Sequence, residues 1–160
     1  MTTRGGLATA LIVLCACSSE PAEPADFVGS WSGTIRVVVS GSPQGESSSW
    51  LYVINGTDGG VLRIAGPCAS DGLGPPAVET DPPLTVTGPH AFRIEPTACP
   101  FQSPMVAICD SFTRIITGGT GSLNGGTLSV TLNADQECAP SPSFAFTTLF
   151  TGTKLTPAAQ

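Results

Sequence analysis

Apolar and polar residues alternate along most of this chain, and apolar residues rarely recur at intervals of three and four. Alternation places every second side chain on one face of an extended strand, so the pattern predicts β-strands rather than amphipathic helices. The first predicted strand has Ile35 and Val37 on one face and Arg36 on the other. In all we predict eight strands, at residues 30–40, 48–55, 60–66, 84–88, 90–95, 112–123, 127–133 and 144–155.

Segments rich in Gly and Pro separate the predicted strands. Residues 124–126 (Asn-Gly-Gly) predict a tight hairpin, because Asn and Gly tolerate the positive φ angles of such turns. Long connections are predicted at residues 67–83, 96–110 and 134–143. Sequential antiparallel strands of this number favour an all-β fold, an eight-stranded up-and-down barrel, since closure removes unpaired strand edges. A two-sheet β-sandwich is the alternative.

Both ends of the predicted barrel carry a distinctive sequence. Residues 29–31 (Gly-Ser-Trp) resemble the G-x-W opening of lipocalin-like barrels, in which the Trp closes the base of the barrel. Residues 150–154 (Phe-Thr-Gly-Thr-Lys) resemble the last strand of such barrels, where a cationic side chain covers that Trp. The family usually has Arg there and this chain has Lys154. The resemblance implies that Trp31 is buried at the barrel base with Lys154 across its ring.

An apolar run near the N-terminus predicts export. Leu7 to Ala16 follows Arg4, and its length of about ten residues suits a signal peptide and is too short to cross a bilayer. The run ends in Leu-Cys-Ala-Cys (14–17), which resembles the lipobox of bacterial lipoproteins. The resemblance implies that residues 1–16 are a signal peptide and that Cys17 is acylated. The alternative is ordinary cleavage after Ser18, without a lipid.

The rest of the chain divides into a tether and one domain. Residues 17–26 are polar, acidic and rich in Pro, which predicts a flexible tether, and residues 27–160 form the predicted barrel domain. Ser18 stands where lipoproteins of this kind retained in the inner membrane have aspartate, so the resemblance implies the outer membrane of a bacterial cell envelope. The chain has 12 Asp and Glu against 6 Lys and Arg, which argues against a nucleic-acid partner.

Cysteine positions predict two disulfides. Of six cysteines, Cys15 leaves with the signal and Cys17 is acylated, so an even set of four remains in an exported chain. Cys68 lies in the third connection, Cys99 and Cys109 in the fifth and Cys138 in the seventh, and odd connections share one end of an up-and-down barrel. We therefore expect all four at the end opposite the start of the first strand. Because the fifth connection neighbours both others, we predict Cys68–Cys99 and Cys109–Cys138. The crossed pairing, Cys68–Cys109 with Cys99–Cys138, is the alternative.

Residues with catalytic potential are few. The sequence has no motif of a serine hydrolase, a zinc protease or a phosphate-binding loop. No two cysteines have zinc-ligand spacing and the one histidine is far from them in sequence, so we expect no metal and no cofactor. Two carboxylate pairs, Glu79 with Asp81 and Asp135 with Glu137, lie in the long connections and form a candidate binding rim.

Together these features predict an exported lipoprotein held at the membrane by its lipid. Its barrel is expected to be a non-catalytic binding module that presents disulfide-linked loops away from the membrane, for a small apolar ligand or a protein partner. The alternatives are a hydrolase that uses the loop carboxylates and a purely structural envelope lipoprotein.

Overall fold

The computed structural model describes residues 26–42, 45–56, 60–68, 81–99, 111–139 and 141–156. These residues contain β1 (Gly29–Val39), β2 (Glu46–Gly56), β3 (Leu62–Ala65), β4 (Pro83–Gly88), β5 (Ala91–Ile94), β6 (Thr97–Ala98), β7 (Ser111–Asn124), β8 (Thr127–Ala139) and β9 (Ser141–Lys154). Within these ranges there is no helix long and apolar enough to cross a membrane.

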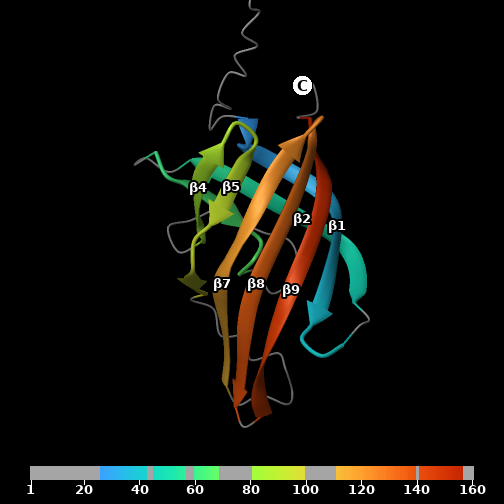
Figure 1. Ribbon diagram of the computed structural model, residues 1–160, viewed down its shortest axis with the longest axis vertical. Coiled ribbons are helices and arrows are strands. Elements are labelled where there is room, and N and C mark those ends of the chain that lie inside the picture. The colour runs from blue at the N-terminus through green and yellow to red at the C-terminus, as the bar shows by residue number, and fades with distance from the viewer. Residues whose placement is uncertain are drawn as a thin grey trace, which may run out of the picture.

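The strands form one antiparallel sheet that closes on itself (Figure 1). The sheet order is β5-β4-β3-β2-β1-β9-β8-β7, and an additional pairing of β5 with β7 joins the two ends into a ring of eight strands. The predicted up-and-down barrel is therefore present, and the β5–β7 pairing rules out two separate sheets. The short strand β6 also pairs with β7, next to the part of β7 that pairs with β5.

Alternate side chains of each strand fill the inside of the barrel. In β2, for example, Tyr52 and Ile54 are buried, with exposed fractions of 1% and 0%. Burying a large apolar side chain contributes about 1.5–3 kcal/mol, so the inward residues supply most of the driving force for folding. The buried core contains Phe27, Trp31, Ile35, Tyr52, Ile54, Leu62, Ile64, Leu84, Phe92, Ile94, Cys99, Ile116, Leu128, Val130, Leu132, Ala134, Phe146 and Phe150.

The end of the barrel where β1 starts, which we call the base, is closed by Trp31. Its side chain is 1% exposed, and its Nε1 donates a hydrogen bond to the carbonyl of Phe27 at 2.9 Å. The Lys154 Nζ lies 5.5 Å from the centroid of the Trp31 ring and donates to the carbonyl of Asp26 at 3.3 Å. The described chain therefore starts beside the base. The expected contact between Trp31 and Lys154 is present there.

Two places in the barrel illustrate why glycine is required there. Gly125 and Gly126 have φ angles of 55° and 82° and join β7 to β8, as residues 124–126 predict. Gly33 lies opposite Gly152 on β9, and a Cβ at Gly33 would stand 2.0 Å from the carbonyl oxygen of Thr151. The β1 and β9 backbones therefore approach each other more closely than any side chain at position 33 would allow.

The prediction of a long connection at residues 134–143 is wrong. β8 continues to Ala139 and β9 begins at Ser141, and residue pairs such as Asp135 with Ala145 extend the ladder between them. The polar and Pro-containing sequence here favoured a loop, but tertiary pairing extends both strands. As a result β7, β8 and β9 are 14, 13 and 14 residues long and project past the other strands at the end opposite the base (Figure 1). We call that end the open end.

Candidate binding pocket

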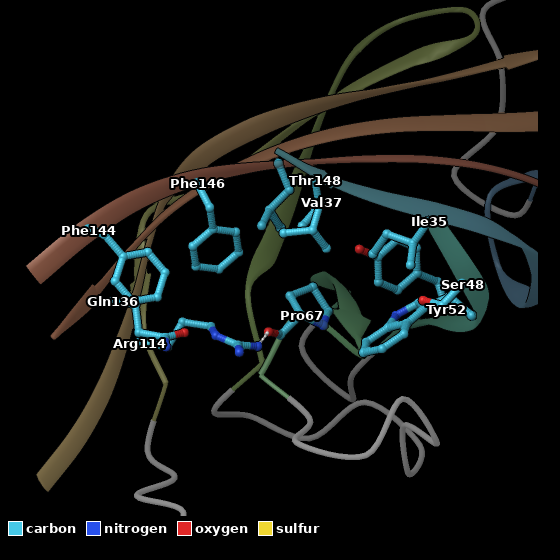
Figure 2. A pocket seen from close by; sticks show the side chains of 12 residues that line it. Ile35, Val37, Ser48, Tyr52, Pro67, Arg114, Gln136, Phe144, Phe146 and Thr148 are labelled. Carbon is cyan, nitrogen blue, oxygen red and sulfur yellow. Dashed lines mark hydrogen bonds between the residues drawn. The ribbon is translucent and has the colours of Figure 1, made fainter. Parts of the chain in front are cut away.

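A pocket of about 260 Å³ lies inside the barrel towards the open end. Its lining comes from the inward faces of β1, β2, β7, β8 and β9 and from Pro67 after β3 (Figure 2). The lining residues are Ile35, Val37, Ser48, Trp50, Tyr52, Pro67, Arg114, Leu132, Gln136, Phe144, Phe146 and Thr148. Trp31 and its neighbours fill the base, so the unfilled part of the barrel interior lies towards the open end.

One wall of the pocket is apolar. Ile35 and Val37 come from β1, Leu132 from β8, and Phe144 and Phe146 from β9. Phe146 is 8% exposed, whereas Phe144 is 37% exposed, so the aromatic surface runs from the interior to the protein surface. This gradient follows from the length of β9, which carries Phe144 beyond the last residue of β1 that pairs with it.

Arg114 brings a positive charge into this apolar surrounding. Its Nη1 donates a hydrogen bond to the carbonyl of Pro67 at 2.9 Å, and its guanidinium carbon lies 5.5 Å from the centroid of the Phe146 ring. Burial lowers the pKa of the Arg114 guanidinium, and the nearby Tyr52 opposes this effect. Arginine stays protonated in proteins despite such shifts, so the pocket holds a partly desolvated cation.

Tyr52, Trp50 and Thr148 add polar groups to the pocket. Burial raises the pKa of Tyr52 to about 12, against smaller opposing effects of Thr148 and Arg114, so its hydroxyl is neutral and able to donate at pH 7. The Nε1 of Trp50 is buried and has no hydrogen-bond partner within the described ranges. The Thr148 hydroxyl lies near that of Tyr52, but the two do not meet the geometry of a hydrogen bond.

The predicted Cys68–Cys99 disulfide is present and lies beside the pocket. Cys68 directly follows Pro67, whose carbonyl accepts from Arg114, and the backbone N–H of Cys99 donates to the Arg114 carbonyl at 2.9 Å. The disulfide therefore joins two segments that each contact Arg114. It also excludes the crossed pairing of Cys68 with Cys109. The other predicted disulfide, Cys109–Cys138, involves side chains outside the described part of the structure.

The predicted carboxylate rim is not formed by the residues that the structure describes. Asp81 is 8% exposed, and its carbonyl accepts a hydrogen bond from Arg63 at 2.6 Å. Asp135 and Glu137 are exposed on β8 and line no part of the pocket, because the expected loop there is a strand. Glu79 lies outside the described residues. In the described ranges, no three residues among His, Cys, Asp and Glu gather into a metal-binding group.

A second hollow of about 380 Å³ lies against β7, β8 and β9. Ser and Thr residues such as Thr120, Ser129 and Thr151 supply much of its lining, and none of its described lining residues is ionisable. Exposed Ser and Thr are ordinary on the solvated face of a sheet. The interior pocket, with its aromatic wall and its partly buried cation, is therefore the stronger candidate for recognition.

Sequence reasoning did not identify Trp50, Tyr52, Arg114 or Thr148 as site residues. For Arg114 the missing signal is a β-bulge in β7, where the register shifts between Ile116 and Gly118. Alternation counted back from the β7–β8 hairpin would place Ile115 inside the barrel and Arg114 outside. The bulge reverses this assignment, which is a common effect of an extra residue in one strand.

Known proteins add little to this picture. No family model matches the sequence, and no curated protein matches it. Among solved structures, the chain is similar to a protein of unknown function from the DUF3598 family of Nostoc punctiforme, with 15% sequence identity and a TM-score of 0.45. The match covers 84% of this chain and 50% of that one, so the chain spans about half the length of that protein.

Proposed function

We propose that this protein is an exported lipoprotein, anchored to the membrane through Cys17, whose barrel binds a small apolar ligand without catalysis. The observation that carries this proposal is the interior pocket, which is apolar on one side and reaches the surface beside Phe144. Ligand sites are typically concave, mostly apolar and equipped with a few convergent polar groups. At about 260 Å³, the pocket suits a ligand somewhat smaller than a drug molecule.

The ionisable groups of the pocket support binding rather than hydrolysis. Among the described residues, its lining includes Tyr52 and Arg114 but no Asp, Glu, His or Cys. A general base works best with a pKa near the operating pH, whereas burial raises the pKa of Tyr52 to about 12 and arginine stays protonated. The hydrolase alternative rests on the loop carboxylates, and Asp81, Asp135 and Glu137 all lie outside the pocket.

The location of the pocket suits a membrane-anchored protein. The described chain starts at Asp26, whose carbonyl contacts Lys154 at the base, and the pocket lies towards the other end of the barrel. A tether attached at residue 26 would leave the open end facing away from the lipid. Soluble ligands and partners would then have access to it.

Filling the pocket should abolish ligand binding. We expect Val37→Trp to weaken binding of the neutral fluorophore N-phenylnaphthylamine at least tenfold, about 1.4 kcal/mol, because the indole would occupy the space beside Phe146. The measurement is a fluorescence titration of the purified protein. Val38→Trp is the matched control, since Val38 is on the same strand and does not line the pocket. Equal affinity in both variants, or no binding by the unmodified protein, would contradict the proposal.

Loss of the anchor cysteine should release the protein. We expect Cys17→Ala to move the protein from the membrane fraction to the soluble fraction or to leave its precursor uncut, because stable anchoring requires the lipid. Cell fractionation with mass spectrometry of the N-terminus measures both outcomes. Cys15→Ala is the control and should remain membrane-bound. Identical partitioning of Cys17→Ala and the parent, with cleavage after Ser18 in both, would reject the anchor.

A further inference from the structure

We propose that the pocket selects apolar ligands that carry an uncharged carbonyl group, and that the indole Nε1 of Trp50 donates a hydrogen bond to the carbonyl oxygen. This inference rests on the proposed function, because it assigns a ligand class to the same pocket. It starts from a donor that is buried in the pocket wall and has no hydrogen-bond partner among the residues that the structure describes.

Trp50 is held in the pocket wall by its neighbours. It lies on the same side of β2 as Tyr52 and packs against the buried core. The rings of Trp50 and Tyr52 meet edge to face, with centroids 6.5 Å apart and planes at 76°. Leaving a buried donor without a partner is unfavourable. A ligand acceptor at Nε1 would therefore remove a cost that the ligand-free protein bears.

The other polar groups of the pocket do not give the same preference. An indole donates only, whereas the Thr148 hydroxyl, also buried without a partner in the described ranges, both donates and accepts. Arg114 is already engaged by the Pro67 carbonyl, the Phe146 ring and a further interaction. Trp50 is therefore the described lining residue that specifically favours an acceptor on the ligand.

The surroundings of Trp50 favour an uncharged acceptor. Moving a carboxylate into an apolar pocket costs far more free energy than moving a carbonyl group, and an indole N–H brings no charge to offset that cost. The chain also carries a formal net charge of −6, which disfavours anions near it. A ketone or ester oxygen accepts from Nε1 and adds no new donor. A carbonyl group therefore matches this site better than a carboxylate or a hydroxyl.

The strand that carries this donor lies across the pocket from two aromatic rings. Figure 2 shows Ser48 and Tyr52, the neighbours of Trp50 along the pocket side of β2, at one side of the pocket. Phe144 and Phe146 lie at the other side, with ring centroids 6.3 Å apart. A carbonyl group bound at Trp50 would therefore direct the apolar part of its ligand towards these rings. A volume of about 260 Å³ suits a small ketone such as butyrophenone.

Displacement of N-phenylnaphthylamine by butyrophenone and by 2-phenyl-1-pentene tests this inference, since the two probes share a shape and differ only in C=O against C=CH2. Trp50→Phe keeps an aromatic ring in the wall and removes the N–H. We expect it to lower the ratio of butyrophenone affinity to alkene affinity by about three- to tenfold. Taking the ratio removes any loss of packing that affects both probes equally.

Phe144→Leu is the matched control. Phe144 lines the same pocket, and its replacement changes the wall without removing a donor. We expect this variant to weaken both probes alike and to leave the ratio unchanged. An equal fall of the ratio in both variants would mean that the shape of the wall, and not the N–H, distinguishes the two probes, which would overturn the inference.

The indole N–H signals in ¹H–¹⁵N correlation spectra give a direct readout. The chain has two tryptophans, and Trp31 already donates to the Phe27 carbonyl, so its signal serves as an internal reference. Butyrophenone should shift the Trp50 signal, which Trp50→Phe identifies. The alkene should shift it much less, because it has no oxygen to accept the hydrogen bond.

The outcomes separate this inference from the proposed function. If N-phenylnaphthylamine binds but neither probe displaces it, or if Trp50→Phe leaves the ratio unchanged, the carbonyl inference fails and the proposed binding of apolar ligands stands. The same holds if both probes shift the Trp50 signal equally. If N-phenylnaphthylamine does not bind, both fail. If Trp50→Phe does not fold, the spectra of the unmodified protein with the two probes still decide.

Discussion

Replacement of Trp31 by alanine is expected to lower the free energy of unfolding by about 3–5 kcal/mol. The indole is 1% exposed and closes the base, so its loss leaves a large cavity that rigid strands cannot collapse into. The Phe27 carbonyl would also lose the hydrogen bond from Nε1. Urea unfolding followed by far-ultraviolet circular dichroism measures the change.

Lys154→Ala is the comparison for Trp31→Ala. The Lys154 side chain is exposed, and a cation over an indole at an exposed site contributes about 0.5–1 kcal/mol. Its removal should therefore cost several-fold less stability than removal of the ring. Similar losses in the two variants would mean that the cation, and not the buried indole, holds the base together.

Loss of the Cys68–Cys99 disulfide is expected to lower the free energy of unfolding by about 2–4 kcal/mol. The bond closes a loop between residues 31 positions apart, so it restricts the unfolded chain and the long connection after β3. The double variant Cys68→Ser with Cys99→Ser is preferable to a single one, because it leaves no unpaired thiol of this pair. Thermal and urea unfolding of the variant and the unmodified protein measure the loss.

The same double variant should also weaken binding of N-phenylnaphthylamine in the pocket. The two cysteines belong to the segments that contact Arg114 through the Pro67 carbonyl and the Cys99 amide. Without the bond we expect this side of the pocket to be less well ordered, which costs affinity for the ligand. A variant that is destabilised yet keeps its full affinity for N-phenylnaphthylamine would show that the disulfide does not support the pocket.

The strand pattern was predictable because burial in a barrel is a local rule. Each strand has one face towards the core, so alternation such as Ile35, Arg36, Val37 reports strand identity without any knowledge of its partners. The hairpin at residues 124–126 was also predictable, since positive φ angles select Gly and Asn. The connection at residues 134–143 was not, because its polar residues are compatible with both a loop and the exposed face of a paired strand.

The numbering of the connections predicts which residues lie at the same end of the barrel. This worked for the disulfide and did not work for the carboxylates. Cys68–Cys99 was one of two pairings that the strand count left open, because odd connections share one end of an up-and-down barrel and neighbouring connections are close, and the structure decides for it. The rim of Asp81, Asp135 and Glu137 used the same logic but assumed that each segment was a loop. Once β8 extends to Ala139, Asp135 and Glu137 belong to its exposed face.

The sequence by itself determined the all-β class, the order of the eight barrel strands, the hairpin after β7 and the cysteine pair at the open end. These depend on side-chain alternation, turn chemistry and connectivity, which are properties of neighbouring residues and of their order. Only the tertiary structure decided where the barrel interior stays open and that Arg114 points into it. Both depend on the extended β8–β9 ladder and on the bulge near Gly118, which arise when strands distant in sequence pair and which alternation along one strand does not encode.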